Sequence, residues 1–186
     1  MDGWWAASYV LLWIVVIMLC MLVVALARQI GALHLRLGPR GAFEADDEGP
    51  PLGEAPPPME VRDPLGAAVA IGGPGSPSLL LFVSPGCHVC EQVLPAVDVV
   101  ARAGALDPLV ITDVDEEETA LAFARRSFKA PVLSGIDVAT SYSVPGTPYV
   151  IVLDGSGVVR AKGTVNNLEQ MEGLVDTAVR RITEAV

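Results

Sequence analysis

An apolar run near the N-terminus constrains this chain more than any other feature. From Trp4 to Ala27 the sequence holds 24 residues without a charge, and only Ser8 is clearly polar. As a helix this run would be about 36 Å long, enough to cross a hydrocarbon core of about 30 Å. Trp4, Trp5 and Tyr9 gather at one end, as aromatic side chains do at a membrane interface. We expect residues 4–27 to form a single transmembrane helix in a lipid bilayer.

A cleaved signal peptide is the alternative for this run. Ala25-Leu26-Ala27 has the small residues of a cleavage site. However, no Lys or Arg precedes the run, and it is longer than the apolar part of a signal peptide, which is about 7–15 residues. A buried core helix is disfavoured because the run has no polar face. The sequence therefore favours an uncleaved anchor.

Three further regions follow the anchor. Residues 28–37 are basic and amphipathic, which predicts a juxtamembrane extension of the helix. Residues 38–63 hold six prolines and seven acidic residues, so we expect an extended linker that cannot bury a core of its own. Residues 64–186 have the length of one ordinary domain.

The charge of the chain excludes one class of partner. The formal net charge is −10, and residues 64–186 contribute fourteen acidic and eight basic side chains. The sequence has no basic patch with interleaved aromatic residues, so we expect no nucleic acid partner. The acidity is expected to keep the domain soluble.

The hydrophobic pattern of residues 64–186 predicts an α/β fold. Helices are expected at 90–104, with a kink at Pro95, at 116–128 and from about 167 onward. The acids at the start of the second helix and the bases near its end, Arg125, Arg126 and Lys129, match the helix dipole. Strands are expected at 67–71, 78–83, 109–112, 131–133, 149–153 and 158–162. This order predicts a three-layer α/β/α sandwich with a mixed sheet.

Two cysteines stand between the most apolar strand and a helix. A cysteine at a helix N-terminus has its thiolate stabilised by free N–H groups and the helix dipole. Cys87 is therefore a candidate attacking thiolate, and Cys90, one turn later, can resolve a mixed disulfide. His88 lies between them and would further favour the thiolate when protonated. The pair itself would be the redox group, with no added cofactor.

Other interpretations of Cys87 and Cys90 stay open at this point. A zinc site needs about four ligands, and the domain offers only these two cysteines and His88, so we expect no such metal. Two thiolates could hold Cu(I), in a carrier or chaperone without turnover. A structural disulfide would stabilise little, because it closes almost no loop. Ser84, three residues before Cys87, also permits a peroxidase cysteine.

A second candidate site element precedes the strand at 149–153. Pro148 follows Gly146 and Thr147 at the entrance of that strand, where an X-Pro bond is a candidate cis peptide, with an ordinary trans turn as the alternative. A proline here loses no N–H bond and lets Thr147 present its backbone groups. We expect Gly146, Thr147 and Pro148 to bind a strand of the substrate beside Cys87.

The strand–Cys-x-x-Cys–helix order, with Thr147-Pro148 before a hairpin, resembles the thioredoxin superfamily. Pro95 also recurs there as a helix kink. The resemblance implies that Cys87 attacks, that Cys90 resolves, and that Pro148 is a cis-proline facing them. Two features depart from thioredoxin: no Trp precedes Cys87, and Leu81 stands where thioredoxins keep a buried acid. A proton acceptor for Cys90 is therefore not evident.

Three segments, 27–31, 81–90 and 160–166, resemble methylamine dehydrogenase accessory proteins of the MauD type. The resemblance implies a membrane-anchored thiol–disulfide oxidoreductase that forms or rearranges disulfides in a partner protein. That partner would be the small subunit of methylamine dehydrogenase, and an upstream redox partner would also be needed. His88 departs from the family, which commonly has proline at this position.

The orientation in the membrane receives opposite predictions. Arg28, Arg36 and Arg40 follow the anchor and Asp2 precedes it, so the positive-inside rule puts the domain in the cytoplasm. The resemblance puts the domain outside, where disulfides persist. We favour the extracytoplasmic side. Cys20, within the span, is expected to be a small apolar side chain.

Overall fold

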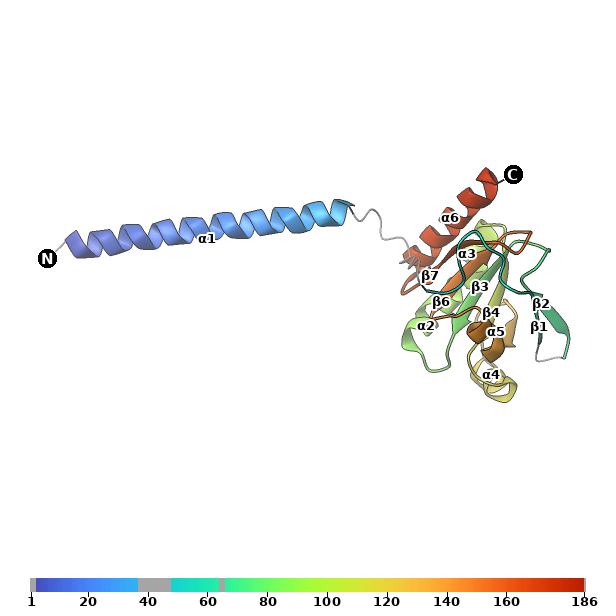
Figure 1. The fold of residues 1–186 in the computed structure, drawn as a ribbon. Helices are drawn as coiled ribbons and strands as arrows, with labels where there is room; N and C mark the ends of the chain where they lie inside the picture. The colour runs from blue at the N-terminus through green and yellow to red at the C-terminus, as the bar shows by residue number, and fades with distance from the viewer. Residues whose placement is uncertain (1–2, 37–47, 64–65, 186) are drawn as a thin grey trace. The chain divides into compact units, whose positions relative to one another are not determined.

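The computed structural model describes residues 3–36, 48–63 and 66–185. The chain divides into two units, Met1–Pro39 and Arg40–Val186. The described residues of the first unit form a single helix, α1 (Gly3–Arg36), which is drawn in blue in Figure 1. The expected linker residues 38–47 lie outside the described residues.

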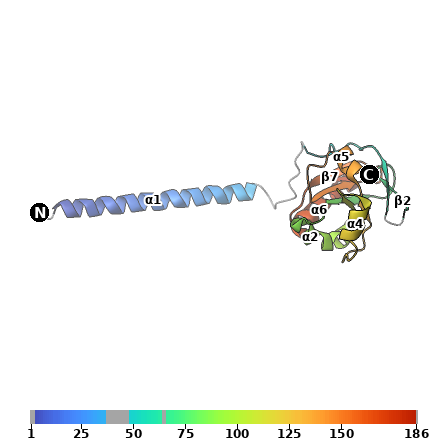
Figure 2. The same ribbon diagram turned by 90° about the horizontal axis from the view of Figure 1, so that it is seen from below.

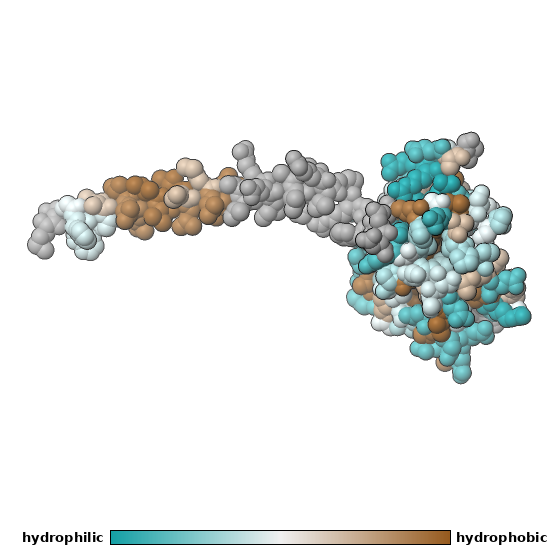
Figure 3. All heavy atoms as spheres, viewed as in Figure 1, coloured by the Kyte–Doolittle hydropathy of each residue, from teal (hydrophilic) through white to brown (hydrophobic). Residues whose placement is uncertain are grey.

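Helix α1 is a candidate membrane span. Its segment Gly3–Val24 is long and apolar enough to cross a bilayer. Figure 3 shows a hydrophobic band along most of this segment, which is paler toward its N-terminal end, and the side chains of the segment are exposed. A helix that is apolar on every side needs an apolar medium around it. The expected single N-terminal apolar helix is confirmed, and it continues without a break into the expected extension.

The second unit is built on a five-stranded mixed sheet with the order β5-β4-β3-β6-β7. The strands are β3 (Ser78–Val83), β4 (Asp107–Thr112), β5 (Val132–Ser134), β6 (Tyr149–Leu153) and β7 (Val159–Thr164). Strands β3, β4 and β5 are parallel, and β6 and β7 are antiparallel additions. The central strand β3 is buried on both faces, which is why its sequence is a continuous apolar run.

The two faces of the sheet are covered by different elements, as Figures 1 and 2 show. Helices α2 (His88–Val93), α3 (Val97–Ala103) and α6 (Leu168–Glu184) pack on one face with Leu79 and Leu81 of β3. Helix α5 (Ile136–Ser141) and the hairpin of β1 (Met59–Arg62) with β2 (Ala68–Ile71) cover the face of Leu80 and Phe82. The expected three-layer sandwich is confirmed, with a hairpin beside α5 in its second outer layer.

The helices differ from the expected ones in three places. The expected helix 90–104 is α2 and α3, separated by the 3₁₀ turn η1 (Leu94–Ala96) that contains Pro95. Helix α4 (Glu116–Ala122) ends six residues before the expected end at 128. Helix α5 was not expected at all, because it is only six residues long and has little periodicity.

Residues 48–63 also differ from the expected linker. They contain β1, and Leu52, Met59 and Val61 pack against the core. The backbone of Gly53 and Glu54 pairs with Val159 through hydrogen bonds of 2.9 Å. The physical reason is that this segment needs no core of its own: it adds its backbone and a few apolar side chains to a core that the sheet supplies.

Candidate active site

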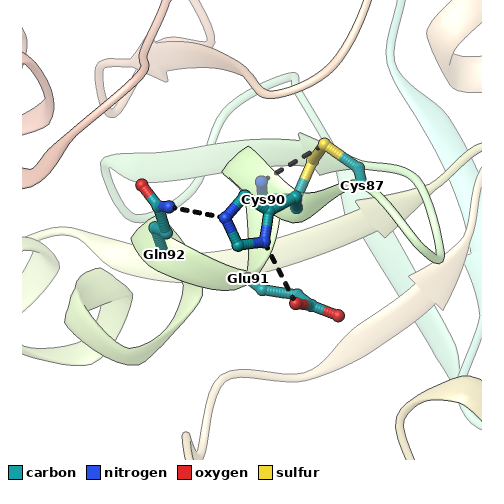
Figure 4. Close-up of polar contacts among 5 residues, drawn as sticks. Cys87, Cys90, Glu91 and Gln92 are labelled. Atoms are coloured by element: carbon teal, nitrogen blue, oxygen red, sulfur yellow. Dashed lines mark hydrogen bonds and ion pairs between the residues drawn. A yellow bond between two sulfur atoms is a disulfide. The ribbon is translucent and has the colours of Figure 1, made fainter.

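Cys87 and Cys90 form a disulfide at the start of α2 (Figure 4). Their Cα atoms are 5.2 Å apart. Cys87 is the N-cap residue of α2, and its Sγ accepts a hydrogen bond of 3.2 Å from the backbone N–H of Cys90. A hydrogen bond to the charged form of a thiol stabilises its thiolate. The local structure therefore favours negative charge on the sulfur of Cys87.

The two sulfurs differ in their access to solvent. Cys87 is half-buried and packs against the edge of the core, whereas Cys90 is only 1% exposed. An incoming thiolate can therefore reach Cys87 more readily than Cys90. This asymmetry is what an attacking and a resolving cysteine require.

His88 lies on the exposed side of α2. Its side chain is 82% exposed, and its Nδ1 lies 3.9 Å from Oε2 of Glu91, which forms an ion pair only when the ring is protonated. Its Nε2 lies 3.1 Å from Nε2 of Gln92. These contacts direct the ring along the helix surface, and within the described residues no hydrogen bond joins it to either sulfur.

The register of the sheet brings Pro148 to the same end as the cysteine loop. Tyr149 pairs with Phe82, so Pro148 lies beside the end of β3, from which the chain continues to Cys87. The Thr147–Pro148 peptide bond is cis, as the sequence suggested. The carbonyl oxygen of Pro148 accepts a hydrogen bond of 3.2 Å from Val165 N–H. Pro148 is buried, Thr147 half-buried and Gly146 exposed.

A cavity of about 210 Å³ opens beside the disulfide. One wall comes from the cysteine loop and α2, including both cysteines, Glu91 and Pro95. The other wall comes from the last residue of α4, Ala122, and from the segment after it, which contributes Phe123, Arg125, Arg126, Ser127 and Phe128. The sequence did not predict this second wall, and Gly146, Thr147 and Pro148 do not line the cavity. A larger cavity, of about 470 Å³, is lined by Leu52, Arg160 and Arg181 and contains neither cysteine.

The surroundings of Cys90 are apolar. Leu81 is completely buried in the same core as Cys90, and Glu91 is exposed and faces the ring of His88. Among the described residues no group of three or more His, Cys, Asp or Glu side chains could hold a metal ion. What the site offers is a dithiol/disulfide pair, which exchanges two electrons by thiol–disulfide exchange.

No family model matches the chain. Its solved structural neighbours include the thioredoxin domain of a thiol-disulfide oxidoreductase from Bacteroides vulgatus (TM-score 0.57, 21% identity, 69% of this chain and 97% of the other). They also include a thiol:disulfide interchange protein from a Bacteroides species (TM-score 0.55, 21% identity, 72% of this chain and 91% of the other). These similarities confirm a thioredoxin-like fold.

Curated relatives match nearly the whole chain. The methylamine utilization protein MauD of Methylorubrum extorquens is 39% identical over 175 residues, which is 91% of this chain and 84% of the relative. MauD of Paracoccus denitrificans is 33% identical over 180 residues, which is 95% of this chain and 90% of the relative. Both matches cover more than nine-tenths of this chain and at least 84% of the relative. The chain belongs to the MauD family of methylamine utilization proteins.

Proposed function

We propose that this chain is a membrane-anchored thiol–disulfide oxidoreductase that forms or rearranges disulfides in a partner protein. The observation that carries the proposal is the Cys87–Cys90 disulfide, with an accessible sulfur that caps a helix and a buried sulfur one turn later. The thioredoxin-like fold and the MauD relatives support the same activity.

The proposed reaction transfers two electrons and two protons from a substrate dithiol to the protein. A substrate thiolate attacks Sγ of Cys87, which breaks the Cys87–Cys90 bond, forms a mixed disulfide and releases Cys90 as a thiolate that takes up a proton. The second substrate thiolate then attacks the substrate sulfur of the mixed disulfide. The substrate disulfide forms and Cys87 leaves as a thiolate. An upstream redox partner restores the Cys87–Cys90 disulfide.

The proposed substrate is the small subunit of methylamine dehydrogenase. The relatives are named for methylamine utilization, and the resemblance of the three segments to MauD-type accessory proteins supports a role in maturation of that subunit. We further propose that Gly146, Thr147 and Pro148 bind the substrate backbone and that His88 tunes the redox pair.

An exchange assay tests this proposal. The full chain in detergent is mixed with reduced or scrambled small subunit, and disulfide formation is followed by mass spectrometry after thiol trapping. Cys87→Ser is expected to abolish exchange. With the scrambled subunit, Cys90→Ser is expected to accumulate a mixed disulfide, because the Cys87 thiolate attacks a substrate disulfide, releases a substrate thiolate and has no resolving partner. Exchange that survives in Cys87→Ser would refute the proposal. Tight Cu(I) retention without exchange would support a copper carrier instead, and Cys87-dependent consumption of hydrogen peroxide would support a peroxidase.

The domain is proposed to lie on the extracytoplasmic side of the membrane, where disulfides persist. The test is labelling of intact cells and spheroplasts with a membrane-impermeant thiol reagent after reduction. Labelling of Cys87 from outside supports the proposal, and labelling only after lysis contradicts it.

A further inference from the structure

Three of the eight basic side chains of residues 64–186 occur within the five residues 125–129. From the sequence we expected Arg125, Arg126 and Lys129 to lie near the C-terminal end of a helix, where they would interact favourably with its dipole. In the structure α4 ends at Ala122, so the helix dipole does not explain the three basic residues. Arg125 and Arg126 are exposed and line the cavity beside the disulfide, and neither forms an ion pair with another described residue.

The buried part of the cavity lining is apolar and consists of Cys90, Leu94 and Phe128. Phe123 and Phe128 line the cavity and pack edge to face, with ring centroids 6.3 Å apart. Phe128 is buried and Phe123 half-buried. Leu94 and Pro95 continue the apolar lining on the side of the cysteines. The cavity therefore offers an apolar floor with positive charge at its rim.

The loop that carries the arginines is held in place by a long-range contact. The carboxylate of Asp98, on α3, accepts hydrogen bonds from the backbone N–H groups of Lys129 (2.6 Å) and Ala130 (2.9 Å). One acidic side chain, Glu91, also lines the cavity, and its carboxylate lies on the side of His88. The net charge at the rim is thus positive in a domain whose net charge is negative.

We propose that this cavity docks an acidic segment of the substrate protein that carries an apolar side chain next to the exchanging cysteine. The proposal rests on the proposed function and adds the substrate class. Charge complementarity selects the occupant: Arg125 and Arg126 attract carboxylates, while the rest of the acidic domain repels them. The apolar side chain would lie on Phe123 and Phe128, which places the neighbouring substrate thiolate at Cys87.

The test uses three peptides that each contain two cysteines, one of them in a Leu-Cys pair. The residues that flank this pair are Asp in the first peptide, Asn in the second and Lys in the third, and the peptides are otherwise identical. Single-turnover oxidation of each peptide by the oxidised full chain in detergent is followed by acid quench and mass spectrometry. The Asp peptide is expected to react about fivefold to tenfold faster with the parent protein than with the variant Arg125→Glu/Arg126→Glu. Because the oxidation rate of the same peptide is compared between two proteins, the pKa of the peptide's own thiols does not affect the ratio of the rates.

The Lys peptide separates docking from damage to the fold. It is expected to react faster with Arg125→Glu/Arg126→Glu than with the parent, a gain that a misfolded variant would not show. The matched control, Arg102→Glu/Arg180→Glu, changes the net charge equally at exposed positions outside the cavity and is expected to react like the parent. High salt is expected to remove the differences. Equal rates for the Asp and Lys peptides across parent and variant would overturn the proposal.

A binding assay distinguishes failure of this inference from failure of the proposed function. Fluorescent versions of the peptides, with serine in place of both cysteines, are titrated with the protein and followed by anisotropy. If no peptide is oxidised, the proposed function fails. Docking is then decided by anisotropy: tighter binding of the Asp peptide that Arg125→Glu/Arg126→Glu abolishes supports it, and equal binding of all peptides overturns it.

Discussion

Tyr149 and Lys162, on the adjacent strands β6 and β7, donate hydrogen bonds to the same carbonyl oxygen. The acceptor is the backbone carbonyl of Glu48, at 3.0 Å from Tyr149 Oη and 2.7 Å from Lys162 Nζ. Both side chains are almost completely buried. The shared acceptor attaches the first described residue of the domain to the face of the sheet.

This shared acceptor predicts a non-additive pair of substitutions. Tyr149→Phe and Lys162→Met each leave the Glu48 carbonyl bonded to the other donor, so neither single variant leaves this buried acceptor without both of its donors. The double variant removes both donors and is expected to cost more than the sum of the single variants. Urea unfolding of the four proteins measures this coupling. Additivity within about 0.5 kcal/mol would contradict the prediction.

The contact of Asp98 with the loop at 129–130 gives a second prediction. Asp98→Asn keeps one oxygen acceptor, so one of the two backbone N–H groups loses its partner, at an expected cost of about 1–3 kcal/mol. Hydrogen exchange of residues 123–131 is expected to become faster in this variant. The matched control, Asp107→Asn, alters an exposed carboxyl outside this contact. Unchanged exchange in the loop would show that Asp98 does not hold it.

The sequence predicted those parts of the fold that depend on local pattern. The strand at 78–83 is a continuous apolar run because β3 is buried on both faces. Pro95 marks the break between α2 and α3, and α6 begins at Leu168, close to the expected start at about 167. The position of Cys87 at a helix start follows from the same pattern. These features depend on neighbours within a few residues.

The parts that the sequence did not predict depend on contacts between distant residues. Residues 48–58 have the composition of a linker, yet Tyr149 and Lys162 bind Glu48 from more than 100 positions away. The loop after α4 has its conformation fixed by Asp98, about 30 residues earlier. For this reason the sequence did not show that Arg125 and Arg126 form a wall of the cavity. The cluster of basic residues at 125–129 did mark the segment as unusual within an acidic domain.

The contact of Asp154 with Arg160 predicts a dependence of stability on acid pH. Burial alone would raise the pKa of Asp154, but hydrogen bonds from Val158 N–H, Arg160 and Ser156 N–H, with the charge of Arg160, lower it overall. A carboxyl whose pKa is lowered in the folded state stabilises the fold above its unfolded pKa of about 3.9, and the stabilisation is lost as pH falls through the folded pKa.

Asp154→Asn is therefore expected to be less stable than the parent at pH 7, with a difference that shrinks as the pH falls below about 4. Urea unfolding between pH 7 and pH 2 checks this. Asp176→Asn, at an exposed position on α6, is the control for loss of a surface carboxylate. A difference that stays constant over the whole range would contradict the assignment.

The proposed tuning of the redox pair by His88 is expected to be small. Its ring is largely exposed and contacts Glu91 and Gln92, so solvent screens its charge from the sulfur of Cys87. His88→Ala is expected to shift the equilibrium with glutathione toward the disulfide by less than about tenfold, which is about 30 mV. Equilibration in glutathione buffers with thiol trapping measures the shift. A larger shift would show that the histidine acts directly on the pair.

Tyr142 predicts a loss of stability at alkaline pH. Its hydroxyl donates to the carbonyl oxygens of Pro57 (3.3 Å) and Ile71 (3.4 Å), and burial raises its pKa from 10.0 to about 12. The unfolded chain therefore releases this proton at a lower pH than the folded chain. The contribution of the protonated hydroxyl is complete below about pH 10 and is lost as the pH rises toward 12.

The matching variant is Tyr142→Phe, which cannot ionise. The stability of the parent relative to this variant is expected to fall by roughly 2 kcal/mol between pH 9 and pH 12. Urea unfolding at several pH values measures the difference, and the comparison with the variant cancels the titration of all other groups. The hydroxyl of Tyr142 also binds the carbonyl of Pro57 and so holds residues 48–58 against the sheet face that α5 covers. Proteolysis within residues 48–58 is therefore expected to become faster over the same pH range. A constant difference in stability would mean that Tyr142 ionises equally in both states.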